Sequence, residues 1–186
     1  MHDIEPYYHW RGLYDSAEDE KSPFAGQIYS EFNYTNKIYN YYIHPQWDNF
    51  GSANLYIKIL YIDYDLGFTI IELIGEWNDC IENDIMYLKR DVIDKLLNEE
   101  VVKFMLICEN VLNFHGSDDC YYEEWKEDVD EQDGWICFIN TLPHVQDEMK
   151  RTMIHHYVNF GKKLDDIHWR KLNPQMLYEY IEQKIL

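Results

Sequence analysis

The residues best suited to chemistry lie where an apolar run turns into an acidic segment, at Gly116-Ser117-Asp118-Asp119. A loop before a helix has unpaired N–H groups and a positive potential, so it could hold a phosphate on Ser117. Asp118 and Asp119 already occupy that field and would repel a phosphate dianion. The alternative is structural: Ser117 or Asp118 caps the following helix, and Asp119 is favourable in its first turn. Ser117 is therefore the phosphoacceptor candidate, with helix capping as the competing role.

His115 stands at the start of the same loop and could pair with Asp118 or Asp119. With Glu123 and Glu124 one turn further on, it forms the alternative acid/base site. A loop histidine near carboxylates more often forms only an ion pair. The chain contains no GxxxxGK[ST], GxGxxG, GxSxG or HExxH motif, so nucleotide-binding and hydrolase functions have no local support. We assign no catalytic residue and expect that the protein is not an enzyme.

The sequence does not predict a metal site. The four cysteines form no CxxC pair and have no zinc-site spacing. Asp128 and Asp130 match the first two ligand positions of an EF-hand calcium loop. Gly134, however, lies one residue beyond the glycine position of that motif, and the final Glu is missing. On an expected strand, His155 and His156 point to opposite faces and cannot chelate one ion together. We therefore expect neither a metal nor a cofactor.

The charge distribution excludes some partners. The net charge is −19, and residues 1–140 hold 9 Lys/Arg against 29 Asp/Glu, whereas residues 141–186 hold 7 against 6. Nucleic acid and anionic membrane surfaces both require clustered basic residues, so neither is expected as a partner. A protein with a basic surface, or a cation, remains compatible with this charge. The N-terminus lacks a signal-peptide core and no apolar run reaches the ~20 residues of a membrane helix, which indicates a cytoplasmic protein.

Hydrophobic periodicity predicts an α/β domain. Two partly alternating runs flank a turn at Asp65-Leu66-Gly67, which indicates a hairpin. Residues 79–98 carry the stripe of an amphipathic helix, with Asn78 or Asp79 as its N-cap. In chain order we expect a hairpin (55–65 and 68–77), a helix (79–98), a buried strand (101–108), an acidic helix (118–132), a buried strand (134–140), a helix from Pro143 to about Met153, a strand (155–161) and a helix from Pro174. This alternation predicts a mixed, partly parallel sheet with helices.

The first part of the chain has a different character. Residues 1–50 form an aromatic-rich N-terminal extension, and residues 51–186 form the α/β domain. Within the extension, residues 27–43 have β-propensity and predict a hairpin around Tyr34–Lys37. Its tyrosines could either add strands that protect the sheet edge or form an interface.

Three segments together resemble the STAS domain, the fold of bacterial anti-sigma factor antagonists. The segment "IIELIGEWNDCIENDIMYLKRDVIDKL" is similar to the strand and capped helix that open that domain. The segment "VVKFMLICENVLNFHGS" resembles its central strand and switch loop, and "DGWICFINTLPHVQDEMKRTMIHHYVNFG" its later strand, proline-started helix and short strand. The resemblance covers residues 55–184 and implies that the loop and its following helix bind a kinase or other partner protein, which phosphorylation releases.

The resemblance also places the loop residues. Ser117 falls on the phosphoacceptor position of that family. Gly116 stands where the family has an Asp, and Asp118 and Asp119 stand where it has a second hydroxyl residue and a Gly. These departures put phosphorylation in doubt more than they do partner binding.

The sequence thus favours a small regulatory or scaffold protein that binds a partner with a basic surface through an acidic loop and helix. The residues expected to meet that partner are Asp118, Asp119, Glu123, Glu124, Glu127 and Asp128. The alternative is an enzyme or small-ligand-binding protein with a pocket between the N-terminal aromatic segment and the sheet. A homodimer built through the tyrosine-rich strands is a third alternative.

Overall fold

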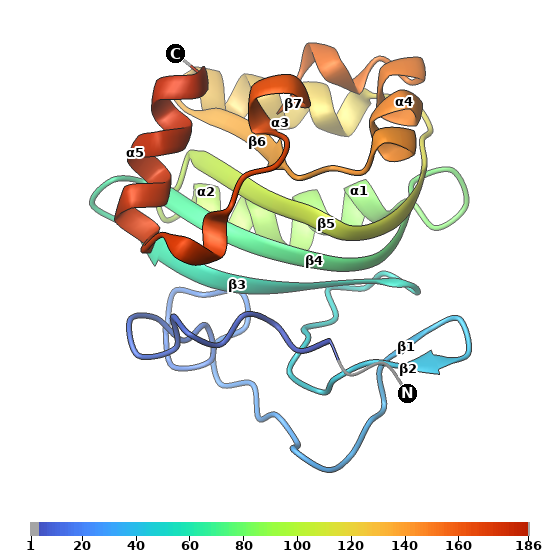
Figure 1. Ribbon diagram of the computed structural model, residues 1–186, viewed down its shortest axis with the longest axis vertical. Helices are drawn as coiled ribbons and strands as arrows, with labels where there is room; N and C mark the ends of the chain where they lie inside the picture. The colour runs from blue at the N-terminus through green and yellow to red at the C-terminus, as the bar shows by residue number, and fades with distance from the viewer. Residues whose placement is uncertain (1–3, 186) are drawn as a thin grey trace.

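A computed structural model describes residues 4–185 and contains one five-stranded sheet with helices on both faces (Figure 1). The strands are β1 (Lys37–Ile38), β2 (Tyr41–Tyr42), β3 (Leu55–Asp63), β4 (Phe68–Asn78), β5 (Lys103–His115), β6 (Trp135–Ile139) and β7 (Asn159–Phe160). The helices are α1 (Asp84–Tyr87), η1 (Leu88–Ile93), α2 (Asp94–Leu97), α3 (Cys120–Asp130), α4 (Pro143–Arg151), η2 (Ile154–His156), η3 (Lys162–Leu164), η4 (Trp169–Lys171) and α5 (Pro174–Ile185).

The sheet has the order β3-β4-β5-β6-β7 and mixes both kinds of pairing. β3 pairs with β4 as an antiparallel hairpin. The pairs β4–β5, β5–β6 and β6–β7 are parallel. The parallel strands need crossover connections, which the intervening helices supply. The α/β class with a mixed, partly parallel sheet, expected from the sequence, is confirmed.

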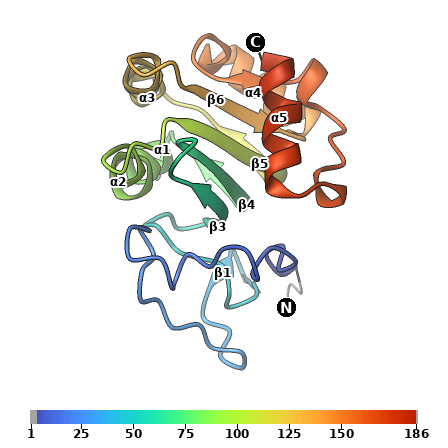
Figure 2. The same ribbon diagram turned by 90° about the vertical axis from the view of Figure 1, so that its left-hand side faces the viewer.

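Two apolar layers cover the two faces of the sheet. Along β5, Phe104 and Leu106 belong to one core cluster, and Met105 and Ile107 belong to the other, as the period-2 alternation of a strand requires. Helices α1, α2 and α3 lie over the first face and α5 lies over the second (Figure 2). β5 is therefore an interior strand buried on both faces.

β5 is longer than the sequence predicted: the strand does not end at Cys108 but continues to His115. Its pairing with β4 extends to the partners Trp77–Phe114 and Asn78–His115 after two irregularities in register. Bulges of this kind shift the alternation, which is why residues 109–115 do not read as a simple strand.

The helical region over the first face begins later than predicted. Helix α1 starts at Asp84, and the residue before it, Asn83, has a left-handed backbone and no side-chain cap. Asn78 is the last residue of β4, and Asp79 is buried, so neither is the N-cap. Asp79 nevertheless accepts a hydrogen bond from the Ile85 N–H at 2.9 Å. It therefore satisfies an N–H of the first helical turn although it lies six residues earlier in the chain.

The N-terminal segment has less β-structure than the sequence predicted. Among residues 4–54, strands β1 and β2 are two residues long each, and they turn at Tyr39-Asn40 rather than around Tyr34–Lys37. They form a separate sheet, so they do not extend the main one. The segment instead lies along the β3 edge, where one bridge joins Asp48 to Ile57 (Figures 1 and 2).

The predicted strand 155–161 is also shorter in the structure. β7 contains only Asn159 and Phe160, and Ile154–His156 form a short 3-10 turn. His155 and His156 are both exposed there, with ring centroids 4.2 Å apart. The expectation that they point to opposite faces of a strand is therefore wrong.

Gly75 allows β3 and β4 to approach each other, and we expect Gly75→Ala to be strongly destabilising. Its φ is +126°, and an added Cβ would lie 1.9 Å from the Asn54 carbonyl oxygen. Backbone strain and this clash together should lower the free energy of unfolding by about 3 kcal/mol or more. Gly12→Ala is the matched control, since its added Cβ meets nothing within 4 Å. Equal urea midpoints for the two variants would contradict this prediction.

Candidate functional site

The β5–α3 loop presents Ser117 on the surface, as the sequence predicted. β5 ends at His115 and α3 begins at Cys120, and both Ser117 and Asp118 between them are exposed. Gly116 packs against the end of α4, where an added Cβ would lie 2.5 Å from the Thr152 methyl carbon. A glycine is thus needed at the position that fixes where the loop leaves the sheet.

The Ser117 hydroxyl is not used to cap α3. The residue before the helix is Asp119, and it makes no side-chain cap hydrogen bond. Asp118 partly fills that role, because its Oδ1 accepts the Cys120 N–H at 3.4 Å. Hydrogen bonds from the Cys120 side chain and backbone lower the pKa of Asp118, and the same carboxylate raises the pKa of the Cys120 thiol. The alternative that Asp118 caps the helix therefore has partial support.

His115 pairs with a different carboxylate from the ones predicted. Its Nε2 lies 2.7 Å from Glu76 Oε1, on the neighbouring parallel strand β4, and not beside Asp118 or Asp119. Glu76 is buried, and its other carboxyl oxygen has no hydrogen-bond partner among the described residues. His115 lines none of the five cavities described between residues 4 and 185.

Two of the acidic residues expected to meet a partner are bound within the chain. Lys89 is only 1% exposed, and its Nζ lies 3.4 Å from Glu124 and 2.8 Å from Asp128, and it also pairs with Asp94. Arg90 adds two hydrogen bonds to Glu124, at 2.6 and 2.8 Å. These contacts join α3 to the 84–97 helical region, so Glu124 and Asp128 act first as structural ion-pair partners.

The same ion pairs explain a cluster that resembles a metal site. Carboxylate oxygens of Asp94, Glu124 and Asp128 all lie within 4.8 Å of one another. The Lys89 ammonium binds all three carboxylates and Arg90 pairs with Asp94 and Glu124, so two cations of the chain already occupy this cluster. Burial alone would lower the pKa of Lys89, but hydrogen bonds to Asp128 and Asp94 raise it. The amphipathic pattern of residues 79–98 predicts Lys89 on the polar face of its helix, but the structure buries it.

Three further acidic residues form a row along one side of α3. Asp119, Glu123 and Glu127 are spaced four residues apart and therefore share one face of the helix. Glu123 and Glu127 are exposed and make no ion pair with any residue between 4 and 185. Partial burial and then Asp119, Glu123 and Glu127 raise the pKa of Tyr157, which places these carboxylates close to that side chain. We call Asp119, Glu123 and Glu127 the acidic row.

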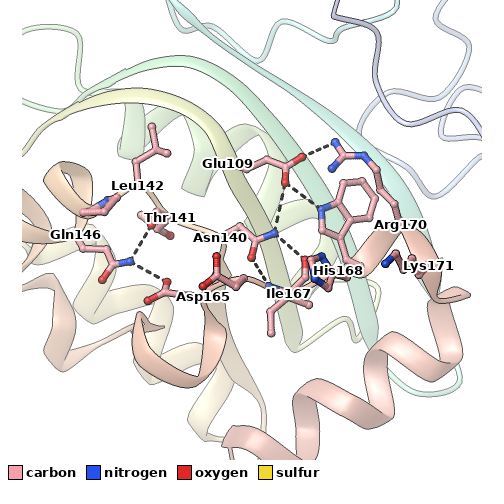
Figure 3. Close-up of a pocket in the computed structure, with 13 residues that line it drawn as sticks. Glu109, Asn140, Thr141, Leu142, Gln146, Asp165, Ile167, His168, Arg170 and Lys171 are labelled. Carbon is pink, nitrogen blue, oxygen red and sulfur yellow. Dashed lines mark hydrogen bonds and ion pairs between the residues drawn. The ribbon is translucent and has the colours of Figure 1, made fainter.

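The alternative function, an enzyme or small-ligand-binding protein, predicts a pocket between the N-terminal segment and the sheet. One cavity there, beside Tyr14 and Lys58, has a volume of about 20 Å³, and another of about 510 Å³ is lined by residues 5–9 and Arg170. A cavity of about 640 Å³ lies beyond the end of β6, between Asn140–Pro143 and residues 165–171 (Figure 3). We call this the β6-end cavity.

Two glutamates lie on the α5 face of the sheet: Glu72 is buried, and Glu109 is half-buried and lines the cavity. Glu72 lies two residues after Ile70 on β4, and Glu109 lies two residues after Ile107 on β5. Ile70 and Ile107 belong to the apolar cluster under α5, so both glutamates lie at the end of that apolar face. Arg170 pairs with Glu109 and lies 3.5 Å from Glu72 (Figure 3 shows the Glu109 pair). Sequence reasoning missed this group, although a charged residue inside an apolar strand was a usable signal.

Asn140 holds the outer wall of the cavity. Its backbone φ is +54°, so the chain turns sharply at the end of β6. Its side chain donates to the Ile167 carbonyl at 2.9 Å and accepts the Ile167 N–H at 2.7 Å. It also donates to Glu109 at 3.4 Å, so one amide ties the outer wall to the sheet (Figure 3).

Within residues 4–185, no helix has the length and apolar character needed to cross a lipid bilayer. No model of a known protein family matches the chain, and no curated protein matches it. Among solved structures, the chain is similar to the crystal structure of a candidate anti-sigma factor antagonist from Thermotoga maritima, with a TM-score of 0.46 and 17% sequence identity. That similarity covers 67% of this chain and 93% of the other.

Proposed function

We propose that this protein is a regulatory or scaffold protein that binds a protein partner through the β5–α3 loop and the acidic row. The observation that carries this proposal is the acidic row itself, since Glu123 and Glu127 are exposed and the described chain supplies no cation to either of them. Like charges one helical turn apart repel each other, and a basic partner surface would relieve that repulsion.

Asp118 extends the row into the loop, where it is exposed beside Ser117. Glu124 and Asp128 then support the surface indirectly, because their ion pairs with Lys89 and Arg90 fix the position of α3. In this proposal Asp118, Asp119, Glu123 and Glu127 contact the partner directly, whereas Glu124 and Asp128 hold α3 in place.

Ser117 is the proposed point of regulation. Its exposed position leaves it accessible to a kinase. A phosphate there would add about two negative charges next to Asp118 and Asp119. That repulsion would alter the loop geometry and therefore the affinity for the partner. The protein would act in the cytoplasm without catalysing a reaction.

Charge reversal of the acidic row tests the proposal. We expect Glu123→Lys with Glu127→Lys to weaken partner capture from the source cell by about tenfold or more, and to remove its salt sensitivity. The control is Glu18→Lys with Glu20→Lys, which changes the net charge equally at two exposed carboxylates that make no ion pair with a described residue. Mass spectrometry of the captured proteins, with and without Ser117→Ala, reports partners and phosphorylation together.

The control decides how the result is interpreted. If both double variants lose the same proteins equally, the capture depends on net charge and the acidic row is not the binding surface. If neither variant loses any partner, the proposed surface is wrong. A homodimer through the exposed Tyr39, Tyr41 and Tyr42 stays a separate prediction, which a mass measurement in solution checks.

A further inference from the structure

The β6-end cavity is large enough for a small molecule and is built from fixed elements. Its volume of about 640 Å³ falls in the range of small-molecule sites. It lies beyond the carboxyl end of the parallel strand β6, the edge at which open α/β sheets bind ligands. The paired hydrogen bonds between Asn140 and Ile167 hold its outer wall in place without a ligand.

Two charged groups that make no ion pair with a described residue lie toward opposite ends of the cavity, and Glu109 lies beside Arg170. Figure 3 shows Gln146 and Asp165 toward one end and Arg170 and Lys171 toward the other. Asp166 lies in the chain next to Asp165 and also lines the cavity. An unpaired carboxylate toward one end and an unpaired ammonium toward the other are complementary to a ligand that carries opposite charges at its two ends.

The charges that matter are those the chain leaves uncompensated. Asp165 is half-buried, and among the described residues its carboxylate accepts one hydrogen bond, at 2.8 Å from the neutral Gln146 amide. Lys171 is exposed and makes no ion pair with a residue from 4 to 185. Glu109, by contrast, is fully engaged by Arg170, Trp169 and Asn140.

We propose that the β6-end cavity binds an elongated zwitterion of the class of short peptides with free termini, with its ammonium group at Asp165 and its carboxylate at Lys171. A carboxylate that accepts a single neutral hydrogen bond retains capacity for an ammonium ion. A lysine without a counter-ion is equally suited to a carboxylate. This site is distinct from the β5–α3 loop, so the proposal does not depend on the proposed function.

Trialanine is the probe, with two blocked forms as matched controls. N-acetyl-trialanine lacks the ammonium group, and trialanine amide lacks the carboxylate. We expect saturable binding of trialanine by isothermal titration, and binding at least about tenfold weaker for each blocked form, because each loses one charge-assisted hydrogen bond. 6-Aminohexanoate serves as a second probe, and tighter binding of it than of trialanine would contradict the peptide class.

Two variants link the probe to the named residues. Asp165→Asn should lower trialanine affinity to that of the N-acetyl form, and Lys171→Gln should lower it to that of the amide. Asp91→Asn and Lys95→Gln are the matched controls, since both residues are exposed and lie outside the cavity lining. Melting temperatures show whether each variant folds. Absence of saturable binding of trialanine, or equal affinity in the variants and their controls, would overturn the proposal.

Discussion

Replacing Lys89 with alanine is expected to destabilise the protein by about 3 kcal/mol, because it leaves three carboxylates without their shared cation. The Lys89 side chain is 1% exposed and binds Asp94, Glu124 and Asp128 at once. These partners are 29%, 38% and 43% exposed, so solvent screens part of their repulsion. The figure is therefore set at the lower end of what a broken buried ion pair costs.

Lys126→Ala is the matched control for this prediction. Lys126 lies on the same helix, α3, and pairs only with Asp130 among the described residues, four positions away. Such a surface pair should contribute less than about 1 kcal/mol. Urea denaturation of both variants measures the two losses of stability. Equal losses would show that the ion pairs of Lys89 contribute no more than an exposed pair does.

The second large effect is a dependence of stability on pH that arises from Asp79. Asp79 is buried and accepts hydrogen bonds from Trp77 Nε1 at 2.8 Å, Ile85 N at 2.9 Å and Tyr122 Oη at 2.7 Å. These donors favour the carboxylate, but burial outweighs them and raises the pKa of Asp79 to about 7. The folded state therefore binds this proton more tightly than the unfolded state, in which the pKa is near 3.8.

The sign of the effect follows from that difference. The contribution of Asp79 to stability is complete below about pH 4 and is lost as the pH rises through 7. At 1.36 kcal/mol for each pKa unit, the loss is on the order of 4 kcal/mol. Burial also raises the pKa of Glu72 to about 7, so Glu72 acts in the same direction.

Asp79→Asn isolates this contribution. The amide keeps an oxygen for Trp77 and Ile85 and can donate to Tyr122, but it does not titrate. We expect the variant to be more stable than the parent at pH 8 and close to it at pH 4. Asp91→Asn, at an exposed position, should follow the parent at both pH values. Thermal unfolding measured from pH 4 to 8 would contradict the prediction if the curves of the Asp79→Asn variant and the parent stayed parallel.

Local pattern predicted most of the architecture. Hydrophobic periodicity and turn residues predicted the β3–β4 hairpin and the interior strand β5. They also predicted the helices α4 and α5, each of which begins at a proline. Ser117 was placed on the surface for the same reason, since a loop must follow a buried strand. The N-terminal segment was harder, because its tyrosines suit strands and irregular packing equally well.

The candidate sites depended on contacts that no local pattern encodes. His115 binds Glu76 because the long register between β4 and β5 places them together, and that register includes two irregularities. Lys89 is buried because α3 brings Glu124 and Asp128 against it. Long-range pairing of this kind becomes visible only when the elements are packed.

Amide chemical-shift mapping of the labelled protein with its captured partner tests the proposed binding surface most directly. We expect the largest perturbations in residues 116–127, which comprise the loop and the acidic row, and we expect them to fade as salt is added. Perturbations confined to Tyr39–Tyr42, or spread over α5 with residues 116–127 unchanged, would contradict a partner bound at the β5–α3 loop.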